Sequence, residues 1–387
     1  MYPPPRTEAG AYRITPAAVP LLDVDHSVRQ NVGFALDQFS AHLDRGWDLA
    51  QKGDAPGATA CARRALEIDP KSPEVHNLLG YTAALAGDAE VALEHYRQAI
   101  ALDETYFEAM LNAAEVLMHP LGEWDDAIAM CDEALDYAET PEEIADCVLL
   151  KVDAFLGKGA TEEAGKAMAL IPDGPFESPN YMFLIGRAYY ETGQLEKAAP
   201  LIEEAAKKDP QNGDALYYLG LVRDERGDTR GATEAFLRAR AVDLTKPPPA
   251  WAPSTDAFAT LMEGVVGKLD AILARYVSEA DVYVVDVPGA ELVVDGVDPR
   301  ALMILDAPSP GEAREAREIT SGLGVREGRD TDRGTGGRIF VYQRNVERAA
   351  GTLDAMEEEL IHALEREITS MFLEKDPTEV IDKHQLN

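Results

Sequence analysis

The sequence has few cysteines, no long apolar run and too few basic residues to balance its acids. Its three cysteines, Cys61, Cys131 and Cys147, show no metal-site spacing, so we expect small buried residues in a reducing compartment and not disulfides. No apolar stretch reaches the roughly 20 residues that cross a bilayer. The first residues, Met1 to Arg6, include three prolines and lack the apolar core of a signal peptide. We therefore expect a cytoplasmic protein without a membrane span.

The deficit of basic residues gives a formal net charge of −34. Such a charge repels phosphate backbones and argues against DNA or RNA as the main partner. The acidity either serves solubility or attracts a basic protein surface, and the sequence leaves both open. The arginines that do cluster lie in or beside a long segment, 308–337, where acids are interleaved with them: Arg314, Arg317, Arg326, Arg329, Arg333 and Arg338. That segment is either a flexible loop or a docking loop that becomes ordered on binding.

Small residues recur every 34 positions between residues 39 and 244. Gly46 and Gly80 are 34 apart, as are Gly186 and Gly220, and pairs of alanines repeat the same offset. Small side chains at fixed intervals are typical of positions where two antiparallel helices cross closely. Helix-reversing turns are predicted at 53–54, 87–88, 193–194 and 227–228, each of which begins with glycine.

The period, the Leu-Gly pairs and the trailing Asp-Pro resemble the tetratricopeptide repeat. The resemblance implies about six helical hairpins over 31–244, with an insertion at 119–124 and a degenerate fourth unit near 141–172. It also implies a solenoid whose groove binds peptides or helices of partner proteins. We expect Asn77, Asn112 and Tyr217 to face that groove as partner contacts.

The last third of the chain, about 261–376, resembles the minimal bacterial zincin-like metallopeptidases. The match rests on four stretches in the family's order: residues 267–273, 281–288, 297–302 and 338–348. It implies a small α+β fold in which 267–273 lie in a helix and 281–288 in a strand. An edge strand then precedes an R-N-x-E-R turn and a final helix. The residues of the expected edge strand are Ile339, Phe340, Val341 and Tyr342.

Both histidines of the zinc motif are missing from the final helix. H-E-x-x-H places two imidazoles one turn apart on a helix, with the glutamate beside the first. This chain has Arg366, Glu367, Ile368, Thr369 and Ser370 instead, so only a vestigial Glu367 remains and Arg366 and Ser370 take the former ligand positions. A guanidinium stays protonated and opposes a cation. We therefore expect a pseudopeptidase without a cofactor.

One alternative keeps a metal. His362 with Glu367 and an acidic residue such as Asp376 would form a non-standard site in an atypical zinc metallopeptidase. A second alternative is a peptide-binding module in which the expected edge strand accepts an extended chain by strand addition.

The sequence thus predicts a mostly α-helical protein of four segments. These are a flexible Pro-rich start (1–30), the repeats (31–244), a Pro-rich linker (245–256) and the zincin-like domain (257–387). The linker is either a stiff spacer, or Trp251 folds back to cap the last repeat. We expect a non-catalytic scaffold or regulatory adaptor that binds protein partners. Neither the identity of the partner nor the oligomeric state follows from the sequence.

Overall fold

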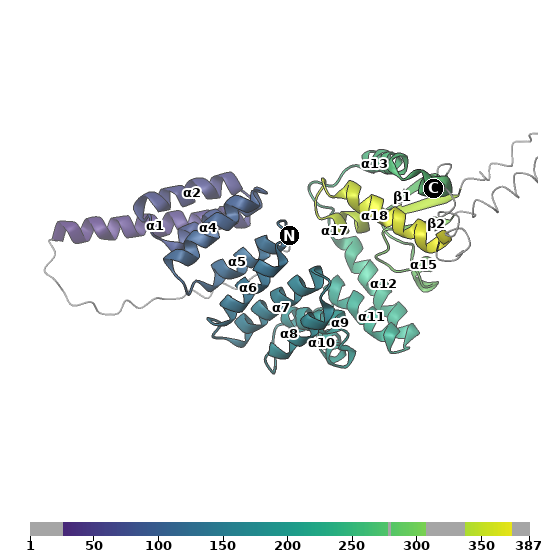
Figure 1. Cartoon of the computed structure of the whole chain (residues 1–387), viewed down its shortest axis with the longest axis horizontal. Helices are drawn as coiled ribbons and strands as arrows, with labels where there is room; N and C mark the ends of the chain where they lie inside the picture. Colours follow the sequence, from purple (N-terminus) through teal and green to yellow (C-terminus); the bar gives the residue numbers. More distant parts are fainter. Residues whose placement is uncertain (1–25, 278–279, 307–336, 374–387) are drawn as a thin grey trace, which may run out of the picture. The chain divides into compact units, whose positions relative to one another are not determined.

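The computed structural model describes residues 26–277, 280–306 and 337–373, with side chains from residue 37 onward (Figure 1). The chain divides into two compact units, one ending at Ala205 and the other starting at Ala206. Helix α1 begins at His26. The expected flexible segment 1–30 was therefore too long at its C-terminal end, and residues 1–25 lie outside the described part.

The first unit consists of helices that follow one another as hairpins. The pairs α1·α2, α3·α4, α5·α6 and α7·α8 pack together. The degenerate unit has a shortened second helix, α8, of seven residues. The elements are α1 (His26–Gln51), α2 (Ala55–Ile68), α3 (Pro73–Leu85), α4 (Ala89–Leu102), α5 (Phe107–Met118), α6 (Trp124–Leu135), α7 (Pro141–Gly157), α8 (Thr161–Ala167), the 3-10 turn η1 (Met168–Leu170), α9 (Pro179–Glu191) and α10 (Leu195–Lys208), which spans the unit boundary.

Glycine turns and small residues produce these hairpins. The predicted turns are confirmed, because Gly53, Gly87, Gly193 and Gly227 all have positive φ, a conformation that costs glycine little. Within a hairpin the helices approach closely. A Cβ at Gly80 would lie 2.6 Å from the ring of buried Tyr96. The three cysteines are free and buried, as expected.

The first helix of each hairpin forms a continuous layer. We call these the A helices and their partners the B helices. Among the described residues, α1 contacts α3, α3 contacts α5, α5 contacts α7, and α7 contacts α9. This A-helix layer is the surface on which a partner groove was predicted.

The second unit joins one more hairpin to a small α+β domain. Its elements are α11 (Gly213–Glu225), α12 (Thr229–Thr245), α13 (Thr255–Lys268), α14 (Ala271–Val277), β1 (Asp281–Val285), α15 (Ala290–Val294), β2 (Met303–Asp306), β3 (Arg338–Tyr342), α17 (Gln343–Ala350), α18 (Met356–Ile368) and a π-helical turn, η2 (Thr369–Leu373). Helices α13 and α18 pack together against the sheet. Their apolar side chains form one core with those of β3, including Phe258, Leu364 and Ile339.

The strand predicted to lie at the sheet edge is central. The sheet order is β1-β3-β2, so Ile339, Phe340, Val341 and Tyr342 pair with β1 in parallel and with β2 in antiparallel fashion. The edge-strand prediction is wrong, because the backbone groups of β3 are engaged on both sides. Strand addition at β3 is therefore excluded.

Three other details of the expected α+β domain also differ. The expected R-N-x-E-R turn is helical and lies in α17. The helix predicted over 267–273 is interrupted, because the Asp270 carboxylate accepts a hydrogen bond from Ile272 N (2.8 Å) and starts α14 anew. The first strand ends at Val285, three residues earlier than predicted.

The connection between repeats and α+β domain is short and held at both ends. Helix α12 ends at Thr245 and α13 starts at Thr255, which narrows the linker from the predicted 245–256. Trp251 packs against the α+β core, so the alternative in which it caps the last repeat is wrong. Gln343 Nε2 donates to Pro253 O at 2.9 Å.

The predicted loop 308–337 lies outside the described residues except for Gly337. No described helix is long and apolar enough to cross a bilayer.

Candidate functional site

Two asparagines link the neighbouring A helices α3 and α5. Asn112 Nδ2 on α5 donates to Asn77 Oδ1 on α3 at 3.0 Å, and Asn77 Nδ2 donates to the Tyr106 hydroxyl at 3.2 Å. Asn77 is only 3% exposed. Its prediction as a partner contact is therefore wrong, because its amide is used between repeats. Asn112 remains half-buried in the A-helix layer.

A tyrosine and a carboxylate form the equivalent link between α7 and α9. The Tyr181 hydroxyl donates to Asp146 Oδ1 at 2.9 Å and lies 3.0 Å from Oδ2. Burial raises the pKa of Asp146 to about 6; the hydrogen bond from Tyr181 opposes the rise, and Glu143 and Glu142 add to it. The two residues are 35 positions apart, the same separation as Asn77 and Asn112. That spacing is the sequence signal by which this pair could have been found.

Arg187 and Asp153 link the same two helices farther along. Arg187 Nη2 donates to Asp153 Oδ1 at 3.1 Å, and the arginine side chain is 10% exposed. Burial raises the pKa of Asp153, and Arg187 opposes that rise. The A-helix layer therefore contains partly desolvated carboxylates, which is unfavourable for an acidic ligand.

Tyr217, the third predicted groove residue, is engaged within the chain. Its hydroxyl donates to Asp298 Oδ2 at 2.8 Å, and the Arg300 guanidinium lies 4.4 Å from its ring centroid. Arg300 Nη2 also pairs with Asp214 Oδ1 at 2.7 Å. Tyr217, predicted as a partner contact, is thus already in contact with the α+β domain. Sequence periodicity does not show a contact made by a different domain.

The R-N-x-E-R segment attaches the α+β domain to the end of α12. Arg344 Nη1 donates to Leu244 O at 3.1 Å and its Nη2 to Lys246 O at 2.8 Å. Arg348 Nη2 pairs with Asp243 Oδ2 at 2.8 Å, where the aspartate side chain is 6% exposed. Unpaired carbonyls at a helix C-terminus favour such cations.

Asn345 fixes the loop that carries Arg300. Its Nδ2 donates to Pro299 O at 3.0 Å and to Ala301 O at 2.8 Å. The same short helix therefore holds α12 and positions the arginine that reaches Tyr217.

The residues in the expected zinc-ligand positions do not fit the metal. His362, Arg366 and Ser370 are exposed, and Glu367 is half-buried. Burial raises the pKa of Glu367, and Arg366 opposes that rise. Helix α18 ends at Ile368, so Ser370 lies in the wider π-helical turn η2. A guanidinium and a hydroxyl are poor zinc ligands.

The alternative metal site also lacks a described ligand set. Across residues 37–277, 280–306 and 337–373, no three His, Cys, Asp or Glu side chains group closely enough to hold a metal ion. Asp376, the acidic ligand considered for His362, lies outside the described residues.

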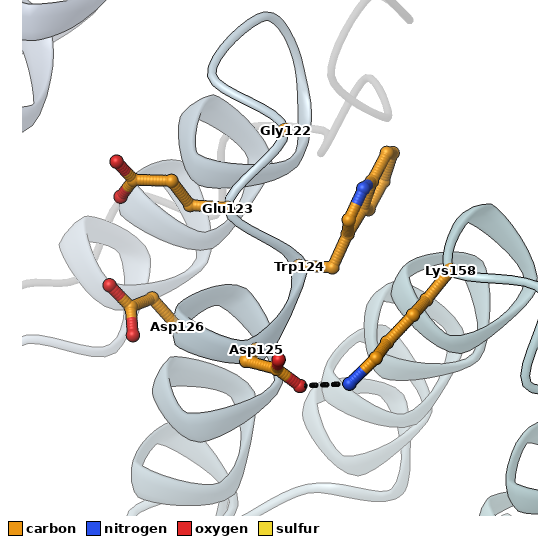
Figure 2. Close-up of a pocket in the computed structure, with 6 residues that line it drawn as sticks. All are labelled: Gly122, Glu123, Trp124, Asp125, Asp126 and Lys158. Carbon is orange, nitrogen blue, oxygen red and sulfur yellow. Dashed lines mark hydrogen bonds and ion pairs between the residues drawn. The ribbon is translucent and has the colours of Figure 1, made fainter.

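A shallow pocket lies at the start of α6, away from these links (Figure 2). It is lined by Gly122, Glu123, Trp124, Asp125, Asp126 and Lys158. Lys158 reaches from the end of α7 to pair with Asp125, as the dashed line in Figure 2 shows. The lysine of the pocket is thus paired with a carboxylate of the same pocket. The other side chains that line it are mainly carboxylates and the Trp124 indole.

The sequence comparison agrees with the hairpin architecture. The family model described as tetratricopeptide repeat matches residues 43–107 and 183–244. No curated protein matches the chain.

Several solved structures align with the repeats. PilF from Pseudomonas aeruginosa is 21% identical, covering 54% of this chain and 93% of its own, with a TM-score of 0.45. PilW, a type IV pilus biogenesis factor, is 20% identical over 52% and 92%, with a TM-score of 0.43. YrrB, a repeat protein with an unusual peptide-binding site, is 18% identical over 47% and 91%, with a TM-score of 0.37. With the helical hairpins and the match to the family model, residues 43–107 and 183–244 are tetratricopeptide repeats.

Proposed function

We propose that this protein is a non-catalytic scaffold that binds a segment of a partner protein along its A-helix layer. The observation that carries the proposal is the series of polar links between successive A helices, Asn77 with Asn112 and Asp146 with Tyr181. These links hold neighbouring helices in register and leave Asn112, Asp146 and Tyr181 half-buried at the surface of the layer. A surface held in this way loses little conformational entropy when it binds.

In this proposal the α+β domain has a structural or regulatory role and performs no hydrolysis. Arg366 and Ser370 in the former ligand positions support this role, because neither side chain suits zinc. The contacts of Arg344 and Arg348 with the end of α12 support it as well, since they give the domain a defined place on the last repeat.

The test is affinity capture with the full chain and paired variants. Asn112→Ala with Tyr181→Ala removes polar groups from the A-helix layer, and Glu94→Ala with Glu133→Ala makes two truncations on exposed B-helix positions. We expect the first pair to lose the captured partners and the second to retain them, with equal helix content by circular dichroism. Unchanged capture by the first pair would overturn the proposal.

A further inference from the structure

The last repeat holds an arginine side chain supplied by the chain itself. The Arg300 guanidinium stacks on Tyr217, with 4.4 Å from its central carbon to the ring centroid, and pairs with Asp214 at 2.7 Å and Asp243 at 3.3 Å. A tyrosine face flanked by carboxylates is a favourable site for a planar cation. Asp243 Oδ1 accepts no hydrogen bond in the described structure, although Lys246 Nζ lies 3.4 Å away.

Two junctions in the first unit combine the same groups. Tyr106 lies near Glu74 and Glu108, and Tyr181 lies near Asp146 and Glu142. In both cases burial raises the pKa of the phenol, and the neighbouring carboxylates raise it further. Glu74, Glu108 and Glu142 are exposed and spaced by 34 residues, so these carboxylates follow the repeat.

These two tyrosine junctions differ from the last repeat in having no cation. Within the described residues, no lysine or arginine lies over Tyr106 or Tyr181. Nor does any described basic side chain form an ion pair with the four carboxylates beside them. Their local partners are neutral: Glu74 accepts from Ser72 Oγ at 2.7 Å, and Asp146 accepts from Tyr181.

We propose that the A-helix layer selects partner segments that carry arginine, and that the Tyr106 and Tyr181 junctions receive guanidinium groups as Tyr217 receives Arg300. This inference rests on the proposed function and specifies the chemistry of its partner. Arginine is favoured over lysine because its planar fork stacks on a ring while it pairs with carboxylates. An acidic segment would be repelled by the same surface.

The experiment compares labelled peptides of repeated Ala-Arg-Ala, Ala-Lys-Ala and Ala-Gln-Ala units by fluorescence anisotropy on the full chain. We expect the arginine peptide to bind about threefold or more tightly than the lysine peptide, because stacking adds to equal charge. The glutamine peptide should not bind. Equal affinities of the arginine and lysine peptides would mean unspecific attraction, and absence of arginine-peptide binding would also overturn the inference.

Variants locate the site and separate its parts. Tyr181→Ala should remove most of the preference for arginine over lysine, whereas Tyr181→Phe should keep it because the ring remains. Glu142→Gln should weaken both charged peptides, and Glu133→Gln on the exposed side of α6 is the control of equal charge change. An arginine preference that survives Tyr181→Ala together with Tyr106→Ala would place the binding elsewhere.

Rejection of the arginine site can be distinguished from failure of the scaffold proposal. Capture that depends on the A-helix layer but is insensitive to excess arginine peptide would leave the scaffold proposal standing and reject the arginine site. Capture that is independent of the layer would reject the scaffold proposal itself.

Discussion

Asp146 is a carboxyl group whose folded environment favours its protonated form. Burial raises its pKa to about 6, against about 4 in an unfolded chain. Between about pH 4 and pH 6, the folded protein therefore keeps a proton on Asp146 that the unfolded chain has released. The stabilisation that comes from this proton is complete below about pH 4 and is lost as the pH rises through about 6.

We predict that Asp146→Asn is more stable than the parent at pH 7 by about 1–3 kcal/mol and that this advantage disappears near pH 4. Urea unfolding at several pH values measures the difference. Glu133→Gln, on an exposed position, should show no such pH dependence. A constant difference between Asp146→Asn and parent would contradict this account.

Two helical glycines should respond in opposite directions to alanine. A Cβ at Gly80 would meet the ring of Tyr96, which is 1% exposed and has little room to move. Gly264 in α13 has no atom within 4 Å of the same position. We predict that Gly80→Ala destabilises by about 1–3 kcal/mol and that Gly264→Ala stabilises by about 0.5–1 kcal/mol. Thermal melts of both variants provide the measurement, and destabilisation by Gly264→Ala would show an unrecognised contact.

The sequence predicts which residues lie on the A helices better than it predicts how deeply their side chains are buried. Periodicity placed Asn77 and Asn112 on the A helices, which the structure confirms, but did not show that Asn77 is 3% exposed. The burial of Asn77 depends on a residue from the next repeat, Tyr106, to which its amide donates a hydrogen bond. Tyr217 was beyond prediction for another reason, since its hydrogen-bond partner Asp298 is 81 residues away in a different fold.

At the scale of elements, Arg344 joins α17 to the end of α12. Arg344 donates to Leu244 O and Lys246 O from two nitrogens, a geometry that lysine cannot reproduce. We predict that Arg344→Lys destabilises the second unit by about 1–2 kcal/mol. Faster amide exchange in the last turn of α12 would accompany the loss. Faster amide exchange in α17 alone would mean that the contacts of Arg344 with the carbonyls contribute nothing to the stability of α12.

Helix α18 permits a test of the resemblance to zincins. Arg366→His with Ser370→His restores H-E-x-x-H around Glu367, and both positions are exposed. We predict weak zinc binding by the double variant in calorimetry and none by the parent or by Arg366→His alone. The π-helical turn η2 widens the helix at Ser370, which should keep the affinity low. Identical behaviour of all three proteins would reject the alignment of this helix.

The strands illustrate the limit of reasoning by resemblance. The sequence predicted extended segments near 281–288 and 339–342, and both exist as β1 and β3. The order of the strands in the sheet was not predictable, because it depends on the pairing of β3 with β2. Strand β2 has only four residues and therefore carries little sequence signal. Once β2 pairs with β3, the expected edge becomes the centre of the sheet.

At the scale of the whole molecule, the unit boundary falls within α10 and not at the Pro-rich connection. Helices α11 and α12 therefore belong with the α+β domain, and Asp243 is the charge that joins them. Its carboxylate pairs with Arg300 and Arg348 while only 6% exposed. Removing one partner of a buried ion pair is more costly than removing an exposed pair.

We predict that Asp243→Asn destabilises the second unit by about 2–4 kcal/mol, and that α12 and α17 lose exchange protection together. Asp306→Asn is the matched control, since its pair with Arg338 is 56% exposed on both sides and should contribute little. Loss of protection in α17 alone would show that the last repeat and the α+β domain unfold separately.

The attachment at α12 also restricts how the protein can change its length in evolution. Arg300, Arg344 and Arg348 recognise Asp214, Tyr217, Asp243 and the final carbonyls of one particular hairpin. A duplicated hairpin inserted after Thr245 would have to carry all of these groups at once to keep the terminal domain attached. Duplication within residues 43–107 would leave that recognition untouched. Growth of the repeat array from its earlier hairpins would therefore preserve the contacts between the last hairpin and the α+β domain.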